Sequence, residues 1–477
     1  MQQLDGLDAF FALNERQHSP MHIGALMIYK SSTSKHKLFL QQEIRQSFKQ
    51  RLSASPIFRR RLFTVACGLD NPYWIEDRYF DLDQHIFSHS IKDHAGDLPG
   101  LLATLHSLPM NMSRPLWEVH VIHGLGNLNI YDKRTFGLYI KVHHAAMDGV
   151  SGTEILAAIH SLEAQTFSPH EARTTIDRWR AELPPKQWQL VHQACINNLR
   201  KPLNLARLAR KLIPSFRQAA SAGRCDHNPT ASWQKSPFNC RINAERNILI
   251  LRFNFLRLRQ IRRHYPQTTV NHVVLSIVGG ALRRYLITRN CLPDNPLASM
   301  IPVNIRSRDG NTAGNAISMM IATLRTDIEC PLQRLQAVRD AANSAKSFSN
   351  TIGRSAITSL VREIPNGIGS ITLRALSALA YWPGGVAMPA CTIVSSVPGP
   401  PVPLYFNDAK LVEMLGLGLI VDHLGLFHVA TSYNGVMTLS VLSSPSALED
   451  PDLYRRCLEE SYASLDEAVS RPLKRNE

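Results

Sequence analysis

Strand and helix patterns run through the first 165 residues of the chain, stop, and begin again near residue 248. Residues 24–29, 117–121 and 136–142 have the composition or alternation of strands, and residues 38–48 and 153–162 repeat apolar side chains at helical spacing. In the second half, residues 248–255 indicate a strand and residues 270–286 a long helix. Because 477 residues exceed what one core usually encloses, we expect an α/β protein of two halves with mixed sheets flanked by helices.

The segment between the two halves is strongly basic. Residues 171–224 carry eleven basic and three acidic side chains, more than half of the net charge of +15. We therefore predict a basic, partly helical connector at 171–237, between an N-terminal domain at 1–170 and a C-terminal domain at 238–477. A positive charge of this size favours an anionic partner, and the candidates are nucleic acid, an acidic membrane surface and a phosphate-bearing small molecule.

No targeting or membrane-spanning segment is predicted. The first residues lack the basic and then apolar order of a signal peptide. The longest apolar candidate, residues 411–430, contains Glu413, Asp422, His423 and His428, so a core strand or helix is the better interpretation. The eight cysteines form no C-x-x-C pair, and we expect free thiols in a cytosolic protein.

Two local signals mark the end of the chain. An Asn-Gly pair at 434–435, between strand-like runs at 427–433 and 436–442, predicts a hairpin because both turn residues need positive φ. The Asp-Pro-Asp run at 450–452 predicts the start of a helix that continues to about Val469.

The residues that carry chemistry are in the run V-H-H-A-A-M-D-G at 142–149, where a strand pattern ends. Alternation along an extended chain sends His143 and His144 to opposite sides, so only one of them can face a given cleft. A histidine accepts a proton near neutral pH, Asp148 can hold the geometry of the loop, and Gly149 permits close backbone approach. A lone histidine is more often a satisfied polar residue, but this combination at a strand–helix junction favours a function.

Other chemistries find less support. His144 and Asp148 could lie four apart on a helix as metal ligands, but there is no H-E-x-x-H and no third ligand at suitable spacing, so we predict no metal. The sequence contains no G-x-S-x-G, which disfavours a serine-hydrolase elbow. It also lacks G-x-G-x-x-G and a Walker A sequence, which disfavours Rossmann and P-loop folds.

The H-H-x-x-x-D-G motif resembles that of the CoA-dependent acyltransferase superfamily, which includes chloramphenicol acetyltransferase and peptide-synthetase condensation domains. Further blocks are similar to the bacterial wax ester synthase/diacylglycerol acyltransferase family, in that family's order and from about residue 5 to about residue 470. These blocks are P-M-H-I-G at 20–24, P-L-W-E at 115–118, V-V-L at 273–275, S-S-V-P-G-P at 395–400 and S-Y-N-G at 432–435. Two positions depart from the family pattern: Asn271-His272 stands for Asn-Asp, and Ser396 replaces an asparagine.

The resemblance implies two chloramphenicol-acetyltransferase-like domains. It also implies transfer of a long-chain fatty acyl group from acyl-CoA to a fatty alcohol, which gives a wax ester, or to diacylglycerol, which gives triacylglycerol. His144 would be the general base and His143 a supporting residue. Asp148 would be structural, with Arg306 as the best candidate for its partner. Acyl-CoA would be a substrate, so no cofactor is expected.

The resemblance also suggests residues that bind substrate. Asn271 would either donate a hydrogen bond near the thioester carbonyl or order the start of its helix. Trp117 is more often a core residue than a ligand-binding one. The Val397–Pro400 block, which includes Pro398 and Gly399, would be a rigid turn that shapes a substrate tunnel, and Ser396 before it is a further candidate for substrate binding.

The implied partners are acyl-CoA, a long-chain alcohol, diacylglycerol and an anionic membrane or lipid-droplet surface. The connector or the Arg59–Arg61 run would contact that surface, which would place a cytoplasmic monomer or homodimer on the inner face of the membrane or on lipid inclusions. A condensation-type enzyme with a carrier-bound donor is an alternative, although P-L-W and S-Y-N-G disfavour it. A nucleic-acid-binding protein would need a recognition module that the sequence lacks. The change at His272 keeps open a catalytically inactive, lipid-binding relative.

Overall fold

The computed structural model describes most of both halves and part of the connector. The described residues are 2–32, 37–51, 55–66, 69–147, 156–157, 159–164, 185–199, 203, 207, 210, 214, 236–263, 265–304, 317–352 and 388–470.

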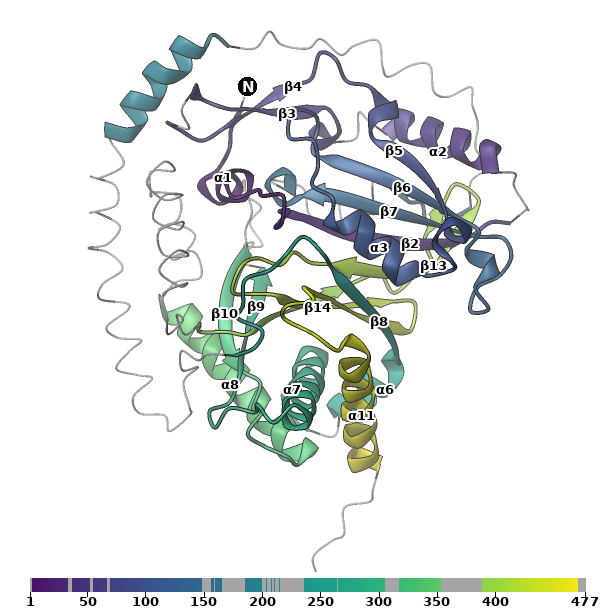
Figure 1. The fold of residues 1–477 in the computed structure, drawn as a ribbon, viewed down its shortest axis with the longest axis vertical. Helices are drawn as coiled ribbons and strands as arrows, with labels where there is room; N and C mark the ends of the chain where they lie inside the picture. The colour runs from purple at the N-terminus through teal and green to yellow at the C-terminus, as the bar shows by residue number, and fades with distance from the viewer. Residues whose placement is uncertain are drawn as a thin grey trace, which may run out of the picture.

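The upper half of the molecule in Figure 1 is built on a six-stranded sheet in the order β12-β13-β2-β7-β6-β5. Its strands are β2 (His22–Lys30), β5 (Ile86–Ser90), β6 (Trp117–His123), β7 (Thr135–His143), β12 (Tyr405–Phe406) and β13 (Ala409–Leu417). All neighbours are antiparallel except β5 and β6, which are parallel. The strands predicted within residues 24–29, 117–121 and 136–142 are therefore confirmed.

Among the described residues, helices α1 (Gly6–Leu13), α2 (Lys37–Arg51) and α3 (Leu98–Ser107) and a small sheet accompany this first sheet. The small sheet has the order β1-β4-β3, from Gln2–Gln3, Tyr73–Glu76 and Arg60–Phe63. Part of the predicted connector packs here: residues 187–199 are helical, and Leu190 and Ala194 form a small apolar cluster with Val65 and Tyr73.

The lower half is a second six-stranded sheet in the order β10-β9-β11-β14-β15-β8. Its strands are β8 (Asn247–Asn254), β9 (Ala298–Asn304), β10 (Ile317–Thr323), β11 (Thr392–Pro398), β14 (Leu426–Tyr433) and β15 (Val436–Ser443). β11 runs parallel to both of its neighbours, so the sheet is mixed. The predicted hairpin is confirmed, with Asn434 at φ 44° and Gly435 at φ 85° between β14 and β15.

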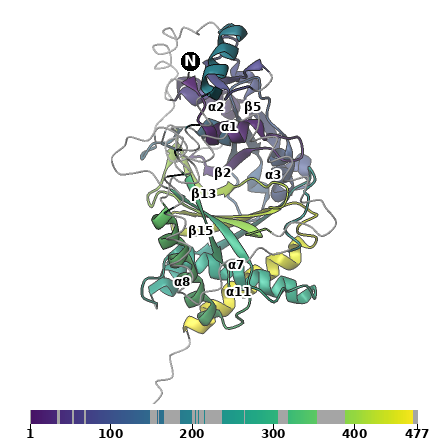
Figure 2. The same cartoon turned by 90° about the vertical axis from the view of Figure 1, so that its left-hand side faces the viewer.

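In the part of this half that the structure describes, four helices accompany the second sheet, and both views place them on its side away from the first half (Figures 1 and 2). They are α6 (Phe255–Arg263), α7 (Val270–Thr288), α8 (Pro331–Ile352) and α11 (Pro451–Ser470). The predicted terminal helix corresponds to α11, and the Asp450 carboxylate accepts a hydrogen bond from the Leu453 N–H (2.8 Å).

The two sheets enclose a shared apolar core. Leu26 and Ile28 of β2 belong to the same buried cluster as Ile250 and Phe427 of the second sheet, whereas Met27 of β2 faces the opposite cluster. The α/β class with mixed sheets is thus confirmed.

One crossover joins the halves more closely than the sequence pattern indicates. β12 and β13 follow β11 in the chain, yet β13 pairs antiparallel with β2 and completes the first sheet. The domain ranges 1–170, 171–237 and 238–477 remain a prediction, and residues 405–417 of the last range lie in the sheet of the first.

Candidate active site

The histidine pair lies where β7 ends and a short 3-10 helix, η6 (His144–Met147), begins. His143 is opposite His22 in the register of β7 with β2. The His143 N–H donates to the Leu116 carbonyl (3.0 Å), and the His144 N–H donates to the Met21 carbonyl (2.8 Å). Backbone bonds to two separate segments therefore fix both histidines.

The His143 ring is enclosed and held on both sides. Its Nδ1 accepts a hydrogen bond from the Ala145 N–H (3.1 Å), and its Nε2 lies 3.3 Å from the Glu15 carboxylate. An accepting Nδ1 places the proton of the neutral ring on Nε2, the nitrogen that lies near Glu15. Because the residue is 0% exposed, it is placed to support the motif rather than to reach a substrate.

His144 is the more accessible residue of the pair, because it is only partly buried whereas His143 is buried. The ring stacks on Phe11 of α1, with centroids 3.9 Å apart and planes 19° apart. Burial, and then the nearby His143, lower the pKa of His144 to about 4. The imidazole is therefore neutral near pH 7, which is the form that can accept a proton.

Two residues near the motif escaped the sequence analysis. Phe11 supplies the face on which His144 stacks, and Glu15 accepts from the Met21 N–H while facing His143. Both precede the motif by about 130 positions, and no local pattern connects them to it. The sequence signal that could have found them is slight: Glu15 follows the aromatic pair at positions 10–11 by a few residues, near the end of a helix.

Asn271 and Ser396 meet, although 125 positions separate them in the chain. The Ser396 hydroxyl donates to Asn271 Oδ1 (2.7 Å). Thr269 is the N-cap of α7. The Thr269 hydroxyl accepts a hydrogen bond from the His272 backbone N–H (3.3 Å), and the Thr269 backbone N–H donates to His272 Nδ1 (3.3 Å). The departure at His272 thus takes part in a capping box, and Asn271 does not cap the helix.

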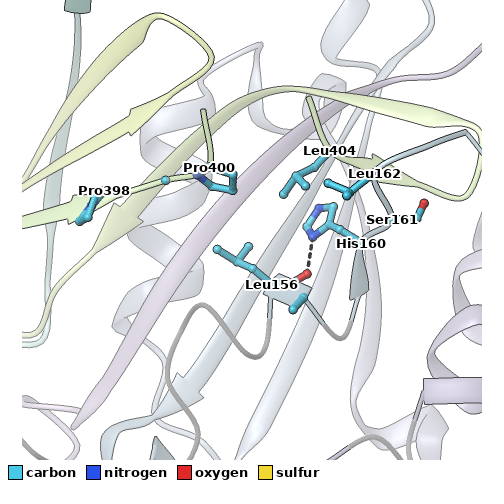
Figure 3. A pocket seen from close by; sticks show the side chains of 9 residues that line it. Leu156, His160, Ser161, Leu162, Pro398, Pro400 and Leu404 are labelled. Carbon is cyan, nitrogen blue, oxygen red and sulfur yellow. Dashed lines mark hydrogen bonds between the residues drawn. The ribbon is translucent and has the colours of Figure 1, made fainter. Parts of the chain in front are cut away.

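Trp117 is a core residue. It is 1% exposed, its indole N–H donates to the Phe58 carbonyl (3.2 Å), and its ring stacks on His85 with centroids 4.5 Å apart. Pro398 and Gly399 differ, because they line a pocket shown in Figure 3. A Cβ at Gly399 would lie 2.3 Å from the Ser432 carbonyl oxygen, so the turn requires glycine.

A buried charge network extends from the motif strand. The Lys141 side chain is 1% exposed, and its ammonium donates to the Leu108 carbonyl (2.8 Å) and lies 3.1 Å from the Glu118 carboxylate. Glu118 also lies 3.3 Å from His120 Nε2. Burial lowers the pKa of Lys141, whereas hydrogen bonds from His120 and the charge of Lys141 outweigh burial and lower the pKa of Glu118.

Three predicted site residues, Asp148, Gly149 and Arg306, lie outside the described residues. Within the described part of the chain, no group of three or more His, Cys, Asp or Glu side chains is placed to hold a metal ion. No helix among the described residues is long and apolar enough to cross a membrane. The six described cysteines are free thiols.

Comparison with known proteins identifies the class. Residues 4–274 match the model of the wax ester synthase/diacylglycerol acyltransferase catalytic domain, and residues 313–466 match the C-terminal domain of the same family. The chain therefore belongs to this family of acyltransferases, as its motifs predicted.

Individual relatives match over nearly the whole chain. A putative diacylglycerol O-acyltransferase of Mycobacterium tuberculosis is 31% identical over 450 residues, which cover 91% of this chain and 85% of the relative. The O-acyltransferase WSD of Acinetobacter baylyi is 27% identical, with 94% and 93% covered. The solved wax ester synthase/diacylglycerol acyltransferase of Marinobacter aquaeolei has the same fold, with a TM-score of 0.68, 24% identity, and 98% of this chain and 100% of that chain covered.

Proposed function

We propose that the protein transfers a long-chain fatty acyl group from acyl-CoA to the hydroxyl of a long-chain alcohol or of diacylglycerol, for the synthesis of neutral storage lipid. His144 is the general base in this proposal. The observation that carries the proposal is the position of His144, which is partly buried and stacks on Phe11 beside a fully buried His143.

The reaction needs one proton acceptor and no covalent enzyme intermediate. His144 takes the proton of the acceptor hydroxyl as the oxygen attacks the thioester carbonyl carbon. The carbon–sulfur bond then breaks, and the imidazolium returns the proton to the departing thiolate, which leaves as CoA. His143 keeps its position through Glu15 and Ala145, so a single ring carries the proton in both directions.

Asn271 is proposed to polarise the thioester carbonyl. Its Oδ1 accepts from Ser396, which leaves the amide N–H₂ group to donate. A donor aimed at the developing oxyanion is among the larger contributions to acyl transfer. In this proposal Ser396 orients Asn271, and therefore fills the place of the asparagine that the family usually has there.

The test uses palmitoyl-CoA with hexadecanol and, in parallel, with diacylglycerol, and follows the release of free thiol and the formation of each ester. His144→Ala should abolish turnover and keep the wild-type circular dichroism spectrum and unfolding temperature. His94→Ala is the matched control, because His94 is also partly buried but lies in another segment. Wild-type turnover in His144→Ala would refute the role of the base. A donor preference for acyl carrier protein would favour the condensation-type alternative.

We further propose peripheral contact with an anionic lipid surface through the helix at residues 187–199. Its inner side packs through Leu190 and Ala194, whereas Trp188 and Leu199 are 66% and 77% exposed at helical spacing. Tryptophan is enriched at membrane interfaces, and the surrounding connector is basic. The Arg59–Arg61 run is a weaker candidate, because Arg60 and Arg61 lie within 3.7 Å of Glu76 and Asp77 respectively.

Liposome flotation tests this contact. The double variant Trp188→Ser/Leu199→Ser should lose flotation with anionic vesicles, and Ile130→Ser, a 65% exposed residue elsewhere, should keep it. Binding that falls with salt indicates the basic contribution, and binding that persists indicates apolar insertion. Equal flotation of the double variant and the wild type would refute the helix as the contact.

A further inference from the structure

A pocket of about 410 Å³ opens between two segments that are distant in the chain. Leu156, Ala157 and residues 160–162 form one wall, and residues 398–400 with Leu404 form the other (Figure 3). Ser161 and Tyr405 exchange two backbone hydrogen bonds of 2.9 Å, which fix the two walls against each other. The pocket therefore lies at the edge of the first sheet, where β12 ends the row of strands.

The polar side chains of the wall already have partners. His160 Nδ1 donates to the Leu156 carbonyl (2.8 Å), so Nε2 is the acceptor for the Tyr29 hydroxyl (2.8 Å). Burial lowers the pKa of His160 to about 4, so the ring is neutral near pH 7. The Ser161 hydroxyl donates to the Glu163 carbonyl (2.6 Å). The wall thus presents the carbon atoms and ring faces of these side chains.

The backbone N–H groups of the other wall are also occupied. The Gly399 N–H donates to the Ser432 carbonyl (2.8 Å), and the Leu404 N–H donates to the Tyr433 hydroxyl (2.9 Å). The two prolines of the turn have no N–H to offer. The nine lining residues include no Lys, Arg, Asp or Glu. Such a pocket has nothing to pair with the phosphates of CoA or with a headgroup, and it suits hydrocarbon.

The strand register gives the separation from the histidine pair. A Cβ at Gly399 would lie 2.9 Å from the terminal methyl of Met414. Met414 pairs with Met27, and Met27 pairs with Leu138 of β7. Leu138 lies two strands from Met414, about 10 Å across the sheet, and precedes His143 by five positions, about 17 Å along the strand, so the near rim lies roughly 20 Å from the motif. A lipid chain in a bilayer spans about 15 Å, half of the hydrocarbon core, so the pocket is within reach of a long chain only when that chain is extended.

We propose that this pocket holds the methyl end of a long hydrocarbon chain whose reacting group lies at His144, and that the bulk at Ala157 limits the length of that chain. This inference rests on the proposed function and adds where the end of one substrate's hydrocarbon chain lies. The chain belongs either to the acyl donor or to the alcohol, and both present the same hydrocarbon chemistry to the pocket.

The test narrows the pocket with Ala157→Phe, at an exposed position where a larger side chain costs little in folding. Ile130→Phe is the control at an exposed site outside the pocket. One arm compares hexadecanoyl-CoA with octanoyl-CoA at a fixed short alcohol, and the other compares hexadecanol with octanol at a fixed short donor. Each displaced methylene weakens binding about fourfold, so kcat/KM for the long substrate relative to the short one should fall at least tenfold in one arm. The arm that responds identifies the chain.

A second readout separates this inference from the proposed function. Hexadecanol and hexadecanoyl-CoA binding are measured for each protein by the rise in unfolding temperature. Should the wild type transfer no acyl group, weaker binding of either long-chain ligand by Ala157→Phe than by the control would still support the pocket. Should the long-to-short ratios and both binding measurements be the same for Ala157→Phe and Ile130→Phe, the pocket assignment is wrong, whether or not the protein is an acyltransferase.

Discussion

Replacing Glu15 by alanine tests how the histidine pair is held. The Glu15 carboxylate accepts the Met21 N–H and lies 3.3 Å from His143 Nε2. The carbonyl of the same Met21 accepts the His144 N–H (2.8 Å). Glu15 therefore supports His143 directly and His144 through one intervening residue.

The magnitude follows from these contacts. A hydrogen bond to a charged group contributes about 1.5–3 kcal/mol, and a donor left buried without a partner adds its desolvation cost. Loss of both contacts in Glu15→Ala should lower the free energy of unfolding by about 3–5 kcal/mol. Glu15→Gln keeps an accepting oxygen at one position and should lose about 1–2 kcal/mol. A shift of about 1 Å in His144 would reduce kcat by about a hundredfold.

Urea unfolding gives the stability of each variant, and thiol release at saturating acyl-CoA gives kcat. Glu459→Ala is the matched control, because Glu459 is an exposed acid on α11. Glu15→Gln should recover much of kcat, since the carboxamide oxygen can still accept. The reasoning fails if Glu15→Ala unfolds at the urea concentration of the control and retains the wild-type kcat.

Four further outcomes follow from the site. The pKa of His144, lowered to about 4, keeps the base unprotonated, so kcat/KM should stay level from pH 8 to about pH 5 and fall at lower pH. A fall in kcat/KM with its midpoint near pH 6.5 would contradict this role of the lowered pKa. The same lowered pKa removes stability as pH drops below about 6.5, because the unfolded chain then binds a proton that the folded chain does not. Lys141→Met should cost about 2–3 kcal/mol in urea unfolding by leaving the partly buried Glu118 without its cation, and Lys141→Met/Glu118→Gln should recover part of that loss. Ser396→Ala should lower kcat by releasing Asn271, whereas Ser396→Asn should restore it; equal kcat for both variants and the wild type would exclude the orienting role.

Local elements of the fold were predictable because their causes are local. The turn at Asn434-Gly435 and the cap at Asp450 each depend on a few adjacent residues, and the structure has both. The pairing of distant segments was not predictable. Residues 411–430 indicated one core element, whereas they contain most of β13, a connection and the first part of β14, in two different sheets.

In the candidate site, too, local features were predictable from the sequence and contacts between distant segments were not. The sequence located the histidine pair, since an unusual motif at a strand end is visible in one dimension. It did not distinguish the accessible ring from the enclosed one by burial, because the burial of His143 depends on Glu15 and on strand pairing with the segment around His22. Likewise, the contact between Ser396 and Asn271 requires β11 and the start of α7 to meet in space.

The crossover of β13 has a consequence for synthesis of the protein. β2 is made among the first 30 residues, but its partner β13 ends at Leu417. Until then one edge of β2 has no permanent neighbour, and an unpaired edge is a template for association with other chains. At about 5–20 residues per second, translation keeps that edge waiting for roughly 20–80 seconds. We expect the nascent chain to depend on a chaperone during this interval, and a chain terminated before residue 405 to aggregate rather than yield a separable first domain.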